Sequence, residues 1–321
     1  MPRALLTLLL VPALGAAVPA PSAAAPPRDV RGQDAPVFGV GLDVVYVTVT
    51  VRDGDGRLVS DLAAEDFVIR EDGRGQSLQL FAPAADPGDR KELALNLGML
   101  FDTSTSMEKH LRLSKHSAIR FLDSIPRAKD LILIFFDRDI RISRYTSENQ
   151  QGIFERILET KSEGYTALYD AIAVYVSRVM GTPGRKVLVL FTDGDDTTST
   201  VTAHEVIHLV RSTSVTVYPV AFGEGRRMSA TNEVRARAFL GELARSSGGE
   251  VFRPMASGEL AEIYNRILDE LNTQYVLGYV SDNQKRDGSY RKLQVEVRRP
   301  RLRLRHRPGY TAPEEPKASD P

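Results

Sequence analysis

Residues 93–106 read LALNLGMLFDTSTS, an apolar run of strand length that ends in an aspartate followed by alternating hydroxyl side chains. A second apolar run, KVLVLFTDG at residues 186–194, also ends in oxygen-bearing side chains. Both runs are apolar on both faces, as the buried central strands of a doubly wound sheet must be. The two stretches therefore predict an α/β fold with a mostly parallel, Rossmann-like sheet.

Apolar strand patterns alternate with helical patterns along this part of the chain, which is typical of parallel βαβ units. The predicted strands are 93–101, 130–136, 186–192, 215–222 and 249–253. The predicted helices are 107–124, 148–159, 167–180, 202–212, 232–246 and 257–272. Ligands of such sheets bind beyond the carboxyl ends of the strands. A site is therefore expected where the two quoted strands end.

Strand patterns without helices lie on both sides of this region. Residues 37–82 contain the β-branched run VVYVTVTV and the turn sequence DGDG, and residues 274–310 contain three more strand patterns. Neither flank has enough strands to bury a face alone. We therefore predict that the flanks pair into a smaller β domain beside an α/β domain at 90–273, followed by a disordered tail at 311–321.

The sequence starts with Met-Pro-Arg3, and a short apolar run follows that ends in small residues, the pattern of a cleaved export signal over residues 1–25. An uncleaved anchor is the alternative reading of the same run. We predict a mature protein without an integral membrane span that is secreted, or held in the periplasm or cell envelope.

The composition is that of an ordinary globular protein. The 321 residues are 42% apolar and 26% charged, which disfavours disordered, coiled-coil and collagen-like classes. The formal net charge is zero, so a charged partner must be attracted by a local patch. Because the chain has no cysteine, stability must come from core packing, from a metal, or from both.

Two carboxylates and two hydroxyls follow the two quoted strands. Asp102, Ser104 and Ser106 form a D-x-S-x-S sequence after the first strand, and Asp193 lies in the T-D-G turn after the second. These hard oxygen donors suit Mg²⁺, Mn²⁺ or Ca²⁺, and because this group contains no cysteine or histidine, zinc is not the natural reading. Asp and Ser also cap helices, and T-D-G also forms turns. Their joint occurrence at two strand ends favours a metal site.

These motifs resemble the von Willebrand factor A domain and its metal-ion-dependent adhesion site, whose remaining position is a threonine between the second and third helices. Thr166 in the stretch GYTAL fits that position. The resemblance implies that Ser104, Ser106 and Thr166 ligate one cation directly. It implies that Asp102 and Asp193 act directly or through water, and that an Asp or Glu of a protein partner displaces a coordinated water. The sequence thus predicts an adhesion-type binding module.

The flanks resemble the ends of a bacterial family of exported A-domain-related proteins, common in acidobacteria. The similar stretches are VTVRDGDGRLVSDLAAEDFVIREDG and QYVLGYVSDNQKRDGSYRKLQVEVRRPRLRLRHRPGY. This likeness implies an exported protein that associates with the envelope or is released, and it says little about function.

Asp137, Asp170 and Asp195 are candidates for outer contacts of the site. Because aspartates at strand and helix ends are more often caps or turn formers, we assign these three to no site.

Residues 204–208 read HEVIH, the H-E-x-x-H pattern of zinc hydrolases. On a helical wheel, His204 and His208 lie away from the apolar side, which predicts an exposed pair. Glu233 is a candidate third ligand at an unusual spacing. A zinc hydrolase, and a structural envelope protein with a purely stabilising metal, are the alternatives to a binding module. No other catalytic motif is found, and we expect no enzyme.

Two further patterns receive structural interpretations. The DGDG sequence predicts a hairpin turn, because no glutamate stands where a calcium loop would close. Arg301, Arg303, Arg305 and Arg307 alternate with other residues, which predicts a solvated strand face that protects a sheet edge. Binding of acidic polysaccharide, lipid head groups or nucleic acid is the alternative. Without interleaved aromatic residues, a nucleic-acid partner is not predicted.

Overall fold

The structure is a computed structural model that describes residues 44–83, 93–125, 128–146, 151–162, 164–223, 229–256 and 258–315. The chain divides into two units, Met1–Gly39 and Val40–Pro321, and every described residue belongs to the second. The predicted export signal at 1–25 lies outside the described residues. Within the described part of the chain, no helix has the length and hydropathy that a membrane crossing requires.

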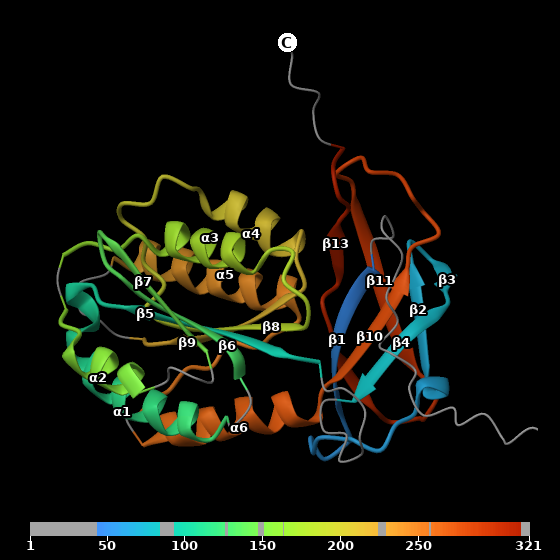
Figure 1. Ribbon diagram of the computed structural model, residues 1–321, viewed down its shortest axis with the longest axis horizontal. Coiled ribbons are helices and arrows are strands. Elements are labelled where there is room, and N and C mark those ends of the chain that lie inside the picture. The colour runs from blue at the N-terminus through green and yellow to red at the C-terminus, as the bar shows by residue number, and fades with distance from the viewer. Residues whose placement is uncertain are drawn as a thin grey trace, which may run out of the picture. The chain divides into compact units, whose positions relative to one another are not determined.

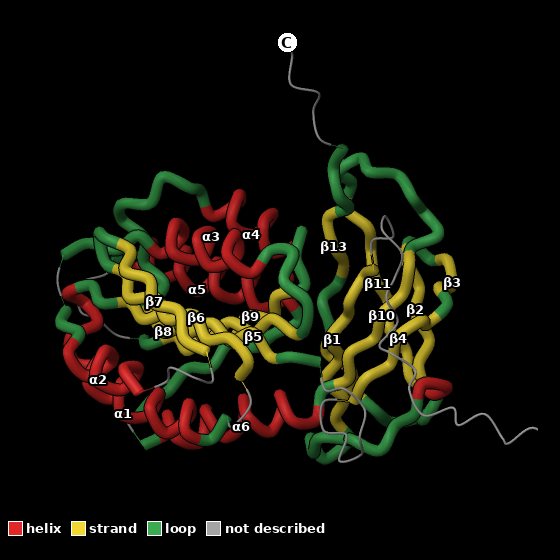
Figure 2. Tube along the Cα trace, in the orientation of Figure 1, coloured by secondary structure: helices red, strands yellow, loops and turns green. Residues whose placement is uncertain are grey.

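A mixed five-stranded sheet forms the centre of the α/β region, in the order β7-β6-β5-β8-β9 (Figures 1 and 2). Four of the strands are parallel, and β7 returns antiparallel beside β6. The strands are β5 (Leu95–Asp102), β6 (Ala128–Phe136), β7 (Ile140–Thr146), β8 (Arg185–Thr192) and β9 (Val215–Ala221). The predicted α/β fold class is confirmed.

Helices cover both faces of this sheet (Figure 1). One face packs against α1 (Glu108–Asp123), α2 (Gln151–Glu159) and α6 (Glu259–Thr273). The other packs against α3 (Leu168–Val179), α4 (Ala203–Arg211) and α5 (Ala230–Ser247). Because side chains alternate along a strand, Val189 of β8 joins the first apolar cluster and Leu190 the second. The apolar runs of the sequence are explained by this double coverage.

Two features of the sheet differ from the sequence prediction. The segment predicted as a strand at 249–253 forms only an isolated parallel bridge between Val220 and Phe252. Strand β7 was not predicted. In its sequence, IRISRYT, apolar and polar residues alternate without an apolar run. β7 is an edge strand, and all of its side chains are exposed or half-buried, so no apolar run is needed there.

The two flanks form antiparallel sheets, as predicted. One sheet has the order β12-β1-β10-β4 and the other β13-β11-β2-β3. Strands of the amino-terminal flank pair with strands of the carboxy-terminal flank, β1 with β10 and β2 with β11. The strands are β1 (Val44–Arg52), β2 (Phe67–Glu71), β3 (Arg74–Gln76), β4 (Leu78–Pro83), β10 (Tyr275–Val280), β11 (Tyr290–Val297), β12 (Arg303–Arg305) and β13 (Gly309–Thr311).

The DGDG segment forms a tight turn, in which the Asp53 carboxylate accepts hydrogen bonds from the backbone N–H groups of Asp55 and Arg57. The disordered tail was predicted to begin at residue 311, which is too early. Thr311 belongs to β13, and Glu314 bridges Asp287, so residues 311–315 are ordered parts of the β region. The Pro- and Glu-rich composition that suggested disorder carries no information about this pairing.

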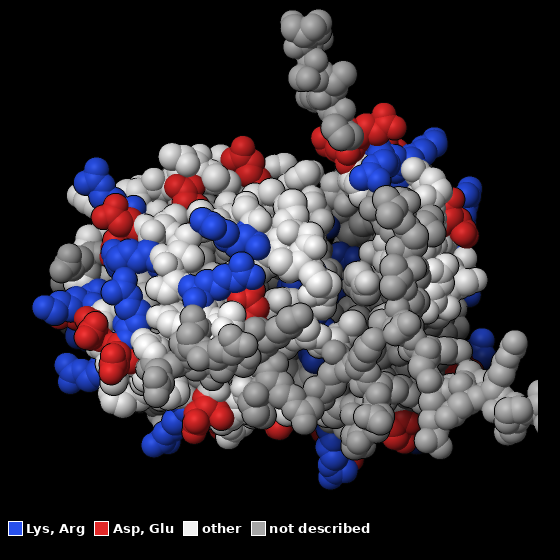
Figure 3. All heavy atoms as spheres, viewed as in Figure 1, with Lys and Arg blue, Asp and Glu red and all other residues white. Residues whose placement is uncertain are grey.

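The prediction that four alternating arginines form a solvated strand face is wrong for two of them, Arg305 and Arg307. Arg303 is exposed, but Arg305 pairs with Glu250 and with the fully buried Glu270. Arg307 is 7% exposed and donates to two backbone carbonyls. Strand β12 has only three residues, so the alternation that would keep all four guanidinium groups on one face does not persist. On the face drawn in Figure 3, basic and acidic side chains are interspersed.

Gly98 gives the first testable prediction. A Cβ at this position of β5 would lie 2.2 Å from the ring of Tyr175, which is fully buried and donates its hydroxyl to the Val187 carbonyl at 2.9 Å. We expect Gly98→Ala to lower the free energy of unfolding by about 1–3 kcal/mol through overpacking. Urea denaturation measures the change. Gly75→Ala is the control, because a Cβ there meets nothing within 4 Å, and an equal loss in both variants would contradict the prediction.

Candidate metal centre

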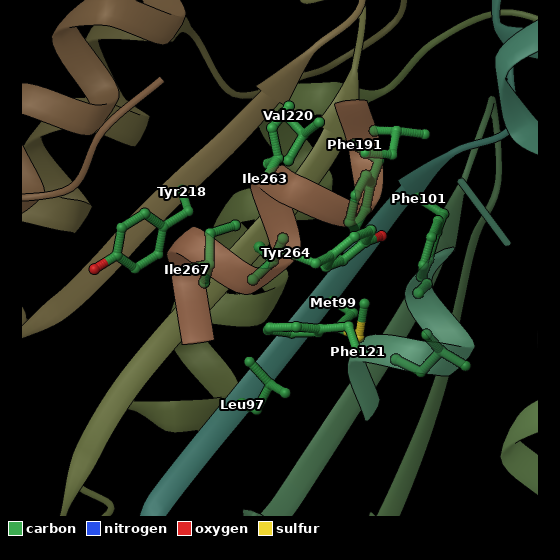
Figure 4. Close-up of a cluster of buried hydrophobic side chains, with 14 of the residues drawn as sticks. Leu97, Met99, Phe101, Phe121, Phe191, Tyr218, Val220, Ile263, Tyr264 and Ile267 are labelled. Carbon is green, nitrogen blue, oxygen red and sulfur yellow. The ribbon is translucent and has the colours of Figure 1, made fainter. Parts of the chain in front are cut away.

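The register of two parallel strands brings the ends of both quoted stretches together. Phe101 of β5 lies opposite Phe191 of β8, so the next residues, Asp102 and Thr192, are neighbours at the carboxyl edge. The Thr192 hydroxyl donates to the Asp102 carboxylate at 2.7 Å. Beneath this edge the two phenylalanine rings stack at 4.7 Å in the apolar cluster of Figure 4. The carboxylate thus lies at the boundary between the core and the loops.

The D-x-S-x-S segment folds around the same carboxylate. The backbone N–H and the hydroxyl of Ser104 both donate to Asp102 Oδ1, at 2.9 and 2.5 Å. The Ser104 and Ser106 hydroxyl oxygens are 3.1 Å apart. Asp102 is 0% and Ser104 2% exposed, whereas Ser106 is half-buried. Three of the predicted ligands therefore form one contiguous group of oxygens that opens toward Ser106.

Backbone groups of Thr166 and of residues next to it in the loop form hydrogen bonds with three neighbouring loops. Its N–H donates to the Thr197 hydroxyl at 2.9 Å in the loop after β8. The preceding Gly164 carbonyl accepts the N–H of Thr105, at 3.4 Å, in the D-x-S-x-S loop. The following residue, Ala167, donates to the Asp137 carbonyl, which follows β6, at 2.7 Å. The structure therefore places Thr166 where the loops of β5, β6 and β8 meet, at 4% exposure.

The T-D-G turn has a steric reason for its glycine. Gly194 adopts a φ of 87°, and a Cβ there would lie 2.8 Å from a methyl carbon of Leu240 on α5. Its N–H donates to the Thr192 hydroxyl at 2.9 Å, which directs that hydroxyl's own proton toward Asp102. Asp193, half-buried, is thereby held beside Asp102 with one oxygen accepting the N–H of Asp195 at 3.1 Å.

The electrostatics of the group favour a cation. Burial, together with the charge of Asp193, raises the pKa of Asp102 to about 7, although hydrogen bonds from Ser104 and Thr192 act in the opposite direction. The described part of the chain buries five acidic side chains, and four of them pair with arginine: Glu71 with Arg291, Asp130 with Arg144, Asp137 with Arg141, and Glu270 with Arg52 and Arg305. Among the described residues, Asp102 alone in this group has no cationic partner.

The donor set fits a hard divalent cation. Carboxylate and hydroxyl oxygens are ligands that Mg²⁺, Mn²⁺ and Ca²⁺ accept. In the described ranges, no three His, Asp or Glu side chains gather as a ligand group. The side-chain oxygens within hydrogen-bond distance of Asp102 are the hydroxyls of Ser104 and Thr192.

The H-E-x-x-H residues lie on α4 and do not belong to the group around Asp102. His204 and His208 are exposed on α4, as the helical wheel predicted. Glu205 accepts the Thr202 N–H at 2.7 Å and Thr202 Oγ1 accepts the Glu205 N–H at 3.3 Å, a capping box that begins the helix. This segment thus has a structural explanation that needs no zinc.

Two of the aspartates that were assigned to no site can be described here. Asp170 accepts the backbone N–H groups of Thr200 and Val201, and the pKa of Asp195 is raised by burial and by the charge of Asp193.

Asp196 was not predicted from the sequence to have a role at the site. It accepts the Tyr169 N–H at 3.1 Å near the start of α3 and so ties the loop after β8 to this helix. Its place two residues after T-D-G was the only signal in the sequence.

A doubly wound sheet with oxygen-bearing side chains gathered at one carboxyl edge defines the class of fold. Residues 96–266, more than half of the chain, match the von Willebrand factor type A domain, and the chain belongs to that family. No curated protein sequence matches it significantly.

Several solved structures are similar. The von Willebrand factor type A protein from Catenulispora acidiphila has 12% identity and a TM-score of 0.47, with 85% of this chain and 74% of that chain covered. The vWF domain of a type V pili tip protein from Porphyromonas gingivalis has 11% identity and a TM-score of 0.47, covering 56% and 95%. Proximal thread matrix protein 1 from the mussel byssus has 16% identity and a TM-score of 0.45; 56% of this chain aligns with 48% of that protein's length.

The raised pKa of Asp102 predicts how the metal-stripped protein responds to pH. In the folded state Asp102 keeps its proton up to about pH 7, whereas its ordinary value is 3.8. Between these values the unfolded chain binds fewer protons, so the free energy of unfolding falls as the pH rises through this window. We expect a loss on the order of 1.4 kcal/mol per pKa unit of difference.

Urea denaturation in the presence of a chelator, from about pH 4 to about pH 8, measures this slope. Asp102→Asn should flatten the decline, because the amide does not titrate. An unchanged slope in that variant would show that another group is responsible.

Proposed function

We propose that this chain is an exported protein-binding module that holds one divalent cation, Mg²⁺ or Mn²⁺ with Ca²⁺ as a further candidate, at the carboxyl edge of its sheet. An Asp or Glu of a protein partner would complete the coordination. The observation that carries this proposal is the buried Asp102 carboxylate, which has hydroxyl and amide donors and the neighbouring Asp193 but no arginine or lysine among the described residues.

The hydroxyls of Ser104, Ser106 and Thr166 would hold the ion, with Asp102 and Asp193 acting directly or through water. When bound, the cation supplies a positive centre that attracts a carboxylate. Neutral hydroxyl ligands neutralise little of the charge of a divalent cation, which supports capture of an acidic group from outside. The rigid backbone contacts around Thr166 support a preformed site, which lowers the entropic cost of binding.

Two alternatives have weaker support. A zinc hydrolase would use His204 and His208, but the intervening Glu205 is engaged in the capping box. A purely stabilising metal needs no open coordination position. The half-buried Ser106 and Asp193 favour an accessible ion over a sealed one. The proposed location, secreted or held in the periplasm or envelope, depends on the apolar amino-terminal run.

Calorimetric titration of the metal-stripped protein with Mg²⁺, Mn²⁺ and Zn²⁺ tests the site. We expect one equivalent of Mg²⁺ or Mn²⁺ to bind, and Asp102→Ala or Thr166→Ala to weaken binding by at least about tenfold, because each removes a ligand or its support. Thr198→Ala, an exposed threonine in a neighbouring loop, is the matched control. Zn²⁺ binding that only His204→Ala removes would instead support the hydrolase.

Partner capture separates adhesion from simple stabilisation. Immobilised protein should retain a partner from envelope extracts in Mg²⁺ and release it with a chelator, and Thr166→Ala should lose this retention while its metal-free thermal unfolding stays unchanged. Metal-dependent stabilisation without metal-dependent capture would favour the structural alternative.

A further inference from the structure

An ion pair outside the five predicted positions lies beside the candidate metal centre. Asp137 follows β6 and is 5% exposed, and Arg141 projects from β7. The Arg141 guanidinium donates to both carboxylate oxygens, at 2.5 Å to Oδ2 and 3.3 Å to Oδ1. The Asp139 N–H donates to Oδ1 at 2.9 Å. Because both oxygens have donors, this carboxylate is engaged in holding protein groups.

The same pair reaches the D-x-S-x-S loop through Thr103, which is 0% exposed. The Thr103 hydroxyl donates to Asp137 Oδ2 at 2.9 Å and accepts Arg141 Nη2 at 3.0 Å. Thr103 stands directly between Asp102 and Ser104 in the chain. Its closed triangle with the ion pair therefore fixes the backbone that carries both of these side chains.

The pair also reaches the threonine loop. The Asp137 carbonyl accepts the Ala167 N–H at 2.7 Å, and Ala167 directly follows Thr166. One residue thus contacts the segments that present Asp102, Ser104 and Thr166. A displacement of Asp137 would change the relative positions of ligands that come from two different loops.

We propose that the Asp137–Arg141 pair is a positioning element that sets the metal affinity of the centre without contacting the ion. This inference rests on the proposed function. Outer contacts that orient metal ligands typically change affinity 10- to 100-fold when they are removed. Strand β7 supplies the arginine, which gives this edge strand a role in the site.

The charge state of Asp137 supports an ion pair. Burial raises the pKa of this carboxyl, but hydrogen bonds from Arg141, from the Asp139 N–H and from Thr103 bring it below its ordinary value. The pair therefore carries opposite charges that cancel. Replacing both residues with neutral amide side chains removes the ion pair and leaves the net charge at the site unchanged, so an altered affinity reports geometry.

The chain contains a control pair on β6 and β7. Arg144 of β7 donates to both oxygens of Asp130 on β6, at 2.8 and 2.6 Å, and Asp130 is 7% exposed. Asp130 precedes Asp137 by seven residues, which places it about 23 Å away along the strand at 3.3 Å per residue. In both pairs a buried carboxylate accepts two hydrogen bonds from an arginine of β7, although the Arg144 side chain is more exposed than that of Arg141, 62% against 37%. The pairs differ in their distance from the centre.

The experiment compares Asp137→Asn/Arg141→Gln with Asp130→Asn/Arg144→Gln in the full chain. Calorimetric titration with Mn²⁺ gives the affinity, the EPR spectrum of bound Mn²⁺ reports its coordination symmetry, and thermal unfolding of the metal-free protein gives stability. We expect about 10- to 100-fold weaker binding and a broadened spectrum for the first variant, and less than about threefold weakening for the second.

Thr103→Val removes only the central hydroxyl at nearly constant shape and keeps the test decisive if the first double variant does not fold. It should weaken Mn²⁺ binding in the same direction. Equal affinities in the two double variants, or an unchanged affinity in Thr103→Val, would overturn the positioning role. Failure of the unsubstituted protein to bind Mg²⁺ or Mn²⁺ would instead overturn the proposed function.

Discussion

The in-register pairing of β5 and β8 is the constraint on which the site depends. Because Phe101 and Phe191 are partners, the residues that follow them meet at one edge, and the Thr192 hydroxyl reaches Asp102. A shift of one residue would exchange the side chains that face one layer of helices with those that face the other. The stacked rings in one apolar cluster therefore stabilise the same register that assembles the polar group above them.

Two glycines let the layers approach closely enough for this arrangement. Gly98 leaves room for the Tyr175 ring against β5, and Gly194 leaves room for Leu240 of α5 beside the T-D-G turn. In both places the missing side chain is replaced by a buried apolar group of a helix. The geometry of the loops thus follows from helix packing on the sheet as well as from their own hydrogen bonds.

The sequence predicts the parts of this structure that local patterns encode. The runs at 93–101 and 186–192 are apolar on both faces, and D-x-S-x-S and T-D-G follow them directly, so the central strands and the placement of Asp102 and Asp193 could be foreseen. The pattern fails where a strand has no apolar run and where a distant partner decides the position of a side chain. Strand β7 has no apolar run, and the inward turn of Arg307 depends on the distant carbonyls of Thr213 and Tyr46.

The positioning pair shows why the remainder of a site escapes sequence analysis. Asp137 and Arg141 are four residues apart, a spacing that suggests a helical neighbour pair. In the structure they lie on either side of the β6–β7 turn, and their common partner, Thr103, lies in the loop after β5. Only the order of strands in the sheet brings these three residues together.

Asp102 differs from the other buried carboxylates of the described structure in having no cationic partner. An unpaired buried charge is costly, and this chain compensates Glu71, Asp130, Asp137 and Glu270 with arginine. Asp102 is buried as deeply as any of them, yet its neighbours in the described structure are hydroxyls, a backbone amide and a second carboxylate. Since neither neutral donors nor Asp193 can balance this charge, the group is compensated by a proton or by a cation, and an exogenous divalent cation compensates both carboxylates at once.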